Sequence, residues 1–107
     1  MTTYLQILDL FNQAKALRQS LSSGGAAALT SNLQVFLMQH PSSHPSVIAL
    51  INSAITLSTQ AQSFLMSGNS QSAQDDVDRI INELVSAVQI SDSATFLPLP
   101  LSMEDPI

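Results

Sequence analysis

The sequence predicts an all-α protein: a small up-down bundle of four helices with an extended, proline-rich C-terminal tail. Apolar residues recur at three- and four-residue spacing in four segments, and short breaks rich in Gly, Pro and Ser separate these segments. The chain has 107 residues, of which 45% are hydrophobic, enough for one domain with a modest core. We expect the bundle over residues 1–92 and the tail over 93–107.

The first helix is expected over residues 3–22 and the second over 26–40. The apolar stripe of the first is Ile7, Leu10, Ala14, Leu17 and Leu21, and that of the second is Ala26, Leu29, Leu33 and Phe36. Gly24 and Gly25 should end the first helix, because glycine commonly follows a helix C-terminus. The second should end at His40, because Pro41 disfavours a helical backbone in the residue before it.

The third helix is expected over residues 45–67, with Pro45 in its first turn and Gly68 after its end. It is apolar over much of its circumference, which favours a central position. One apolar stripe is Leu50, Ala54, Leu57, Ala61 and Phe64, and the other is Val47, Ile48, Ile51, Ile55 and Leu65.

The fourth helix is expected over residues 72–90, opening with a capping-box-like pattern from Ser72 to Asp75. Its acidic start suits the positive end of the helix dipole. Its apolar face is Val77, Ile80, Ile81, Leu84 and Val88. After Asp92 the alternating prolines of TFLPLPLSMEDPI predict an extended backbone.

Charge is scarce. Charged residues make up 10% of the chain, where about 25% is typical, and the net charge is −5. The basic residues are Lys15, Arg18 and Arg79, too few to neutralise nucleic acid phosphates or to dock on an anionic membrane. Polar residues interrupt the most apolar window, from Val47 to Met66, which makes it a poor membrane span. We expect a soluble, cytoplasmic protein.

The two histidines lie in the stretch QHPSSHP. His40 and His44 are four residues apart, a spacing that could chelate a metal ion on a continuous helix. Pro41 and Pro45 break the helix between them, and no acidic or cysteine ligand is close in sequence. The stretch therefore predicts a turn, with a metal or acid–base site as the alternative, and we expect no metal and no cofactor.

Templates for catalysis are missing from the sequence. There is no cysteine, no G-x-S-x-G elbow and no E-x-x-H motif, and the SSGGAAAL stretch lacks the lysine of a phosphate loop. We expect a protein that is not an enzyme and has no catalytic residues.

The strongest pattern is the absence of charge from residue 19 to residue 74, which covers both central helices. The residues expected outside their core are Ser31, Asn32, Gln34, Gln39, Asn52, Ser53, Thr56, Ser58, Thr59, Gln60, Gln62 and Ser63. Depletion of charge with retained hydrogen-bonding groups is typical of the centre of a protein interface. The alternative is a generally low-charge composition, with solubility supplied by the eight acidic residues.

Candidate contact residues follow from this pattern. On the central helices they are Val35, Leu37, Met38, Gln60 and Gln62, and on the tail they are Phe96, Leu97, Leu99 and Leu101. An extended apolar tail can lie in a groove of a partner, of a sister subunit or of its own bundle.

One stretch resembles a known class. A helix, a proline-bracketed turn from Pro41 to Pro45, a second long helix and then DDVDRII resemble the hairpin subunits of type III secretion needles. The resemblance covers about half the chain and implies polymerisation into a tubular filament. The chain departs from that pattern in its longer turn and its proline-rich tail.

The function we expect is protein–protein interaction or assembly, as an adaptor, a chaperone-like partner or a homo-oligomer building block. The alternatives are a needle-like filament subunit, and a bundle whose third helix lines a cavity for a small apolar ligand.

Overall fold

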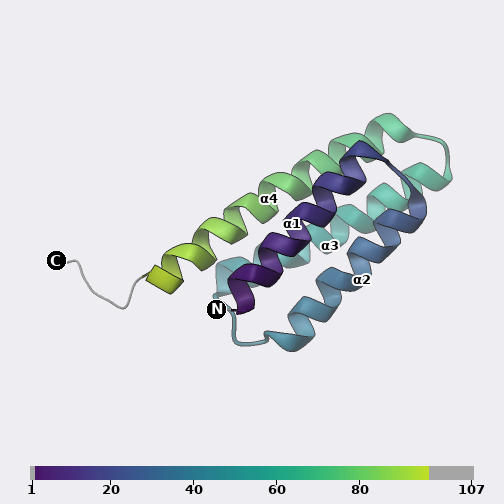
Figure 1. The fold of residues 1–107 in the computed structure, drawn as a ribbon. Coiled ribbons are helices and arrows are strands. Elements are labelled where there is room, and N and C mark those ends of the chain that lie inside the picture. Colours follow the sequence, from purple (N-terminus) through teal and green to yellow (C-terminus); the bar gives the residue numbers. More distant parts are fainter. Residues whose placement is uncertain (1, 97–107) are drawn as a thin grey trace.

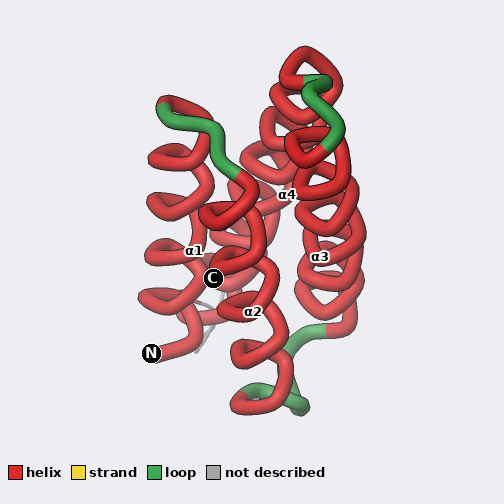
Figure 2. The backbone as a smooth tube through the Cα atoms, turned by 90° about the vertical axis from the view of Figure 1, so that its right-hand side faces the viewer, coloured by secondary structure: helices red, strands yellow, loops and turns green. Residues whose placement is uncertain are grey.

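The protein is a bundle of four antiparallel helices in up-down order (Figure 1). The structure is a computed structural model that describes residues 2–96, with side chains for residues 4–91. The helices are α1 (Thr2–Gln19), α2 (Ser23–Gln39), α3 (Pro45–Met66) and α4 (Ser70–Phe96). The α1–α2 and α3–α4 loops lie at one end of the bundle and the α2–α3 loop at the other (Figure 2).

The four helices close into a ring. α1 contacts α2 and α4, and α3 contacts the same two neighbours. The interface between α3 and α4 is the most extensive and that between α1 and α2 the least. A single core runs through the ring: Ile7, Leu10, Ala14, Leu17, Ala26, Leu29, Leu33, Phe36, Val47, Ile51, Ala54, Leu57, Ala61, Ala73, Val77, Ile80, Leu84 and Ala87.

The predicted core of α2 is confirmed residue for residue, whereas that of α3 is partly wrong. Leu50 and Phe64 are only half-buried, although both pack against the core. Val47 and Ile51, from the second predicted stripe, are buried instead. Because α3 packs between α2 and α4, its buried face draws on both stripes.

The turn between α1 and α2 differs from the prediction. α1 ends at Gln19, and Gly24 and Gly25 lie in the first turn of α2 rather than after α1. Ser22 is the N-cap of α2, and its Oγ accepts a hydrogen bond from the Gly25 backbone N–H at 2.9 Å. A Cβ atom on Gly25 would meet Leu17 Cδ1 and Ser22 Oγ at 2.9 Å. Glycine here therefore allows the two helices to approach closely.

Two residues form the turn between α3 and α4. Gly68 has a φ of +84°, the left-handed conformation that ends a helix. Its N–H donates to the Leu65 carbonyl and the Asn69 N–H to the Phe64 carbonyl, the bond pair of a Schellman motif. Asn69 Oδ1 in turn accepts from the Ser72 N–H at 3.2 Å. The predicted start at Ser72 is therefore wrong, since α4 begins at Ser70 behind an asparagine cap.

α4 also runs further than predicted. It continues to Phe96, past the expected end at residue 90, because the sequence holds no glycine or proline between Gly68 and Pro98. The tail expected from residue 93 therefore overlaps the helix as far as residue 96. Its remaining part, with Leu97, Leu99 and Leu101, lies outside the described residues.

Candidate protein interface

Charge is segregated onto one long side of the bundle. Every charged residue of the four helices belongs to α1 or α4, and these two helices are neighbours. They are joined by an ion pair, in which Arg18 Nε donates to Asp78 Oδ1 at 2.7 Å. The Gln74 amide, oriented with its oxygen toward the guanidinium, also accepts from Arg18.

The opposite side, built from the neighbouring helices α2 and α3, carries no charged residue. We call its exposed residues the charge-free face. On α2 they are Gly24, Ala28, Ser31, Asn32, Gln34, Val35, Met38 and Gln39; on α3 they are Pro45, Ser46, Ala49, Asn52, Thr56, Thr59, Gln60, Ser63 and Met66. Hydroxyls and amides dominate this face, so it can form hydrogen bonds without ion pairs.

Large apolar side chains stand out from the charge-free face. Met38 is 79% exposed, Met66 72% and Val35 45%. Leu37, also predicted as a contact residue, is half-buried and packs against the core. Met38 and Val35 thus occupy the exposed positions that a contact role requires, and Leu37 does not.

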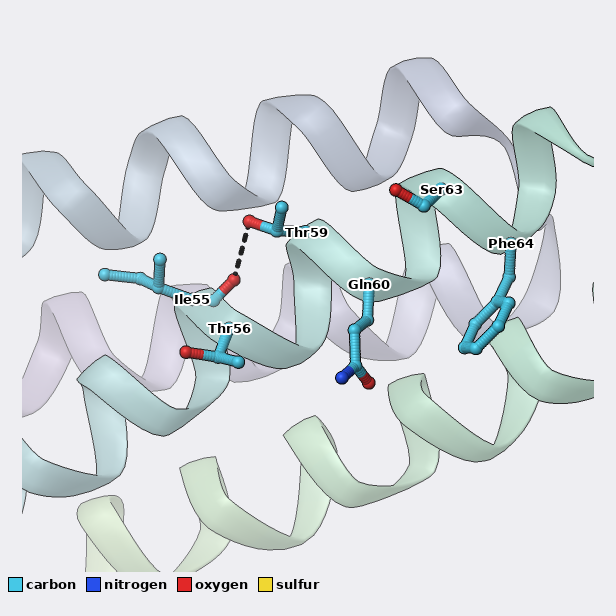
Figure 3. Close-up of a pocket in the computed structure, with 6 residues that line it drawn as sticks. All are labelled: Ile55, Thr56, Thr59, Gln60, Ser63 and Phe64. Atoms are coloured by element: carbon cyan, nitrogen blue, oxygen red, sulfur yellow. Dashed lines mark hydrogen bonds between the residues drawn. The ribbon is translucent and has the colours of Figure 1, made fainter.

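A hollow of about 490 Å³ lies on the outer surface of α3 (Figure 3). Thr56, Thr59, Gln60 and Ser63 line it at positions i, i+3, i+4 and i+7, the four-residue arrangement that accepts a knob in helix–helix packing. Ile55 and Phe64 complete the lining. Gln60 and Phe64 extend on the side of α3 that faces α4 (Figure 3).

The threonines of this hollow satisfy their own hydroxyl donors. Thr59 Oγ1 donates to the Ile55 carbonyl at 2.9 Å, and Thr56 Oγ1 donates to the Asn52 carbonyl at 3.3 Å. Because these donors are used within α3, the threonines offer methyl groups and acceptor oxygens to anything that enters. The hollow therefore suits an apolar side chain.

Val35 lies beside a different hollow. It lines a recess of about 200 Å³ between α1 and α2, together with Gln6, Asp9 and Gln13. Amide contacts bridge this seam, since Gln13 Nε2 donates to Asp9 and Asn32 Nδ2 donates to Gln13, each at 2.8 Å. Val35 therefore sits at the border with the charged side and does not share a hollow with Gln60.

Two serines expected at the surface face other helices instead. Ser58 is fully buried, with its Oγ 2.6 Å from Thr30 Oγ1 across the α2–α3 interface. Half-buried Ser53 donates to Glu83 on α4 at 2.5 Å. Gln62 is half-buried as well, while Gln60 is exposed. The helical period alone did not separate these positions, because they lie at the edges of the apolar stripe.

The histidines act as helix ends. His40 is the C-cap of α2, packs on the Phe36 ring at a centroid distance of 4.8 Å and forms a hydrogen bond with Gln6 of α1. His44 is the N-cap of α3, where its Nδ1 accepts from the Ser46 N–H at 3.0 Å. Among the described residues, no three His, Cys, Asp or Glu side chains gather closely enough to hold a metal ion.

No family model, curated protein or solved structure matches this chain. Within residues 2–96, no helix combines the length and apolarity needed to cross a membrane. The functional argument therefore depends on the surface and the buried polar groups of the bundle.

Two buried carboxyl groups on α4 were not expected from the sequence. Asp76 is 6% exposed and its Oδ2 has no hydrogen-bond partner, while Glu83 uses Oε2 for Ser53 and leaves Oε1 buried without one. Desolvation by burial raises the pKa of Asp76 above its ordinary value of 3.8; the positive charge of Arg79 opposes this shift and the charge of Asp75 adds to it. The acidic start of α4 suggested capping, but Asp76 faces inward.

Asp76→Asn is expected to stabilise the protein by about 1 kcal/mol at pH 7, because it removes a buried and incompletely paired carboxylate. Since burial raises the folded-state pKa of Asp76, the stability supplied by the protonated form is lost as pH rises from about 3.8 through that pKa. Urea unfolding of both proteins at several pH values should show the gain at pH 7 and its disappearance near pH 3.

The matched control is Asp75→Asn, at the exposed neighbouring position, which should change stability by less than about 0.5 kcal/mol. An equal gain from both substitutions would mean that general charge reduction, and not burial, is responsible.

Proposed function

We propose that this chain is a non-enzymatic protein-interaction or assembly module, and that it binds its partner through the charge-free face of α2 and α3. The observation that carries the proposal is the segregation of charge. An uncharged side formed by two neighbouring helices lies opposite a side that carries all the helical charges.

Two properties of this face support binding to protein. Charged residues are depleted at the centre of protein interfaces, whereas solvated helices usually carry Lys and Glu outward. Exposed Met38 and Met66 add apolar contact area, and methionine adapts its shape to an irregular partner surface. The hollow around Thr59 and Gln60 has the geometry that receives a side chain from a partner helix.

The remaining polar features have structural explanations. The histidines cap helices, and Arg18 and Asp78 pair across α1 and α4. Asp76 and Glu83 are buried between packed helices, away from the hollows described above. A binding role, carried out in the cytoplasm, therefore remains our proposal over a catalytic one.

Photo-crosslinking in cells that produce the protein tests this proposal. A benzophenone amino acid at Thr59 samples the charge-free face, and the same residue at Asn12 samples an exposed position on α1. We expect protein adducts from position 59 and few from position 12, whether the captured protein is another chain or a second copy. Equal labelling from both positions, or none from position 59, would contradict the proposed binding face.

A further inference from the structure

We infer that the partner of the charge-free face is a second copy of this chain, and that two copies pair about a two-fold axis with Met38 of each entering the α3 hollow of the other. The inference rests on the proposed binding role of this face and adds the identity of the partner.

The first support is electrostatic. The chain carries a net charge of −5, so two copies repel each other if their charged sides meet. Pairing through α2 and α3 places α1 and α4 of both copies on the outside, because these helices form the opposite side of the bundle. This arrangement keeps the helical charges of the two copies far apart and leaves them solvated.

The second support is self-complementarity. A two-fold contact brings the same surface from both copies together, so the surface must match itself. Carboxylates only accept hydrogen bonds and ammonium groups only donate them, whereas Ser, Thr, Asn and Gln carry groups of both kinds. A face of hydroxyls and amides such as Gln34, Asn52 and Gln60 can therefore pair with its own copy, without requiring opposite charges on a partner.

The third support is the presence of a projection and a recess on the same face. Met38 is the most exposed large apolar side chain among the described residues, and it lies on α2. The hollow lined by Thr56, Thr59, Gln60 and Ser63 lies on α3. A two-fold axis between them exchanges the two features, so each copy supplies one projection and one recess. The flexible thioether side chain suits this recess, whose threonine donors are already satisfied.

The size of the face is adequate. α3 has 22 residues, which corresponds to a length of about 33 Å. Two helices packed about 10 Å apart give a layer about 20 Å wide, so the face covers about 600 Å² in projection. Its side chains make the accessible area larger than this projection, near the roughly 800 Å² that each partner buries in a standard interface.

Sedimentation equilibrium of the purified full chain over a concentration series tests the pairing. We expect a concentration-dependent rise to twice the chain mass of 11.4 kDa. Thr59→Glu puts a carboxylate at the hollow and should weaken the dimer at least about tenfold, whereas Asn12→Glu on α1 adds the same charge with little effect. A chain that stays monomeric, or a dimer weakened equally by both substitutions, overturns the inference.

Disulfide trapping provides a second measurement that does not depend on the stability of a charged variant. The chain has no cysteine, so single substitutions are unambiguous. Mixing Met38→Cys with Thr59→Cys under mild oxidation should give a mixed disulfide dimer, because the Cα atoms must come within about 7 Å. Mixing Asn12→Cys with Thr59→Cys should give much less, and equal yields overturn the inference.

The two proposals fail in different ways. A strictly monomeric chain that still forms adducts with another protein from position 59 rejects the second copy as partner and keeps the binding role of the face. A monomeric chain without adducts from that position rejects both.

Discussion

Leu33→Ala is expected to lower the free energy of unfolding by about 3 kcal/mol, because it leaves a cavity at a fully buried position of α2. Leu33 lies in the core shared by all four helices, so the lost packing cannot be replaced by solvent. Chemical denaturation followed by circular dichroism measures the change. The proteins should be compared at one fixed concentration, because self-association would shift the transition.

Val35→Ala is the matched control, two residues further along the same helix. Val35 is 45% exposed, so its truncation should change stability by less than about 0.5 kcal/mol. The pair separates a core residue from a predicted contact residue on one helix. Similar costs at both positions would contradict the orientation of α2 described above.

Ser53→Ala is expected to cost about 2 kcal/mol, because it removes a hydrogen bond to a carboxylate that is partly shielded from water. Ser53 Oγ donates to Glu83 Oε2 at 2.5 Å, and Glu83 Oε1 is already buried without a partner. The substitution leaves both oxygens of Glu83 without a partner across the α3–α4 interface. Urea unfolding at pH 7 measures the cost.

A double-mutant cycle assigns this cost to the pair. In a Glu83→Gln background the acceptor is neutral, so Ser53→Ala should cost only about 1 kcal/mol. Ser31→Ala, an exposed serine on α2, should have an effect below about 0.5 kcal/mol. Equal costs of Ser53→Ala in both backgrounds would show that the two side chains are not coupled.

The binding role and the stability of the bundle involve different parts of α3. Its inner residues, such as Ile51 and Ala54, fill the core, while Thr56, Thr59 and Ser63 remain on the outer surface. Substitutions such as Thr59→Glu can therefore alter binding without removing core packing. This separation allows the interface experiments to be interpreted independently of folding.

The helices themselves could be predicted from the sequence because their signals are local. Apolar spacing located all four helices and the entire core of α2, and the prolines placed the α2–α3 turn. Helix ends were less predictable where one residue type serves two purposes. Gly24 and Gly25 can follow one helix or open the next, and the Ser22 cap together with the tight approach to Leu17 decided between them.

The charge-free segment and its polar composition are properties of the sequence alone, since they require only counting along the chain. Only the tertiary structure decided that α1 and α4 are neighbours, which gathers the helical charges on one side and leaves the other uncharged. It also moved Ser58 into the core and exposed Met38. The physical reason is that periodicity describes a helix relative to its own axis, whereas burial and adjacency depend on which other helices pack around it.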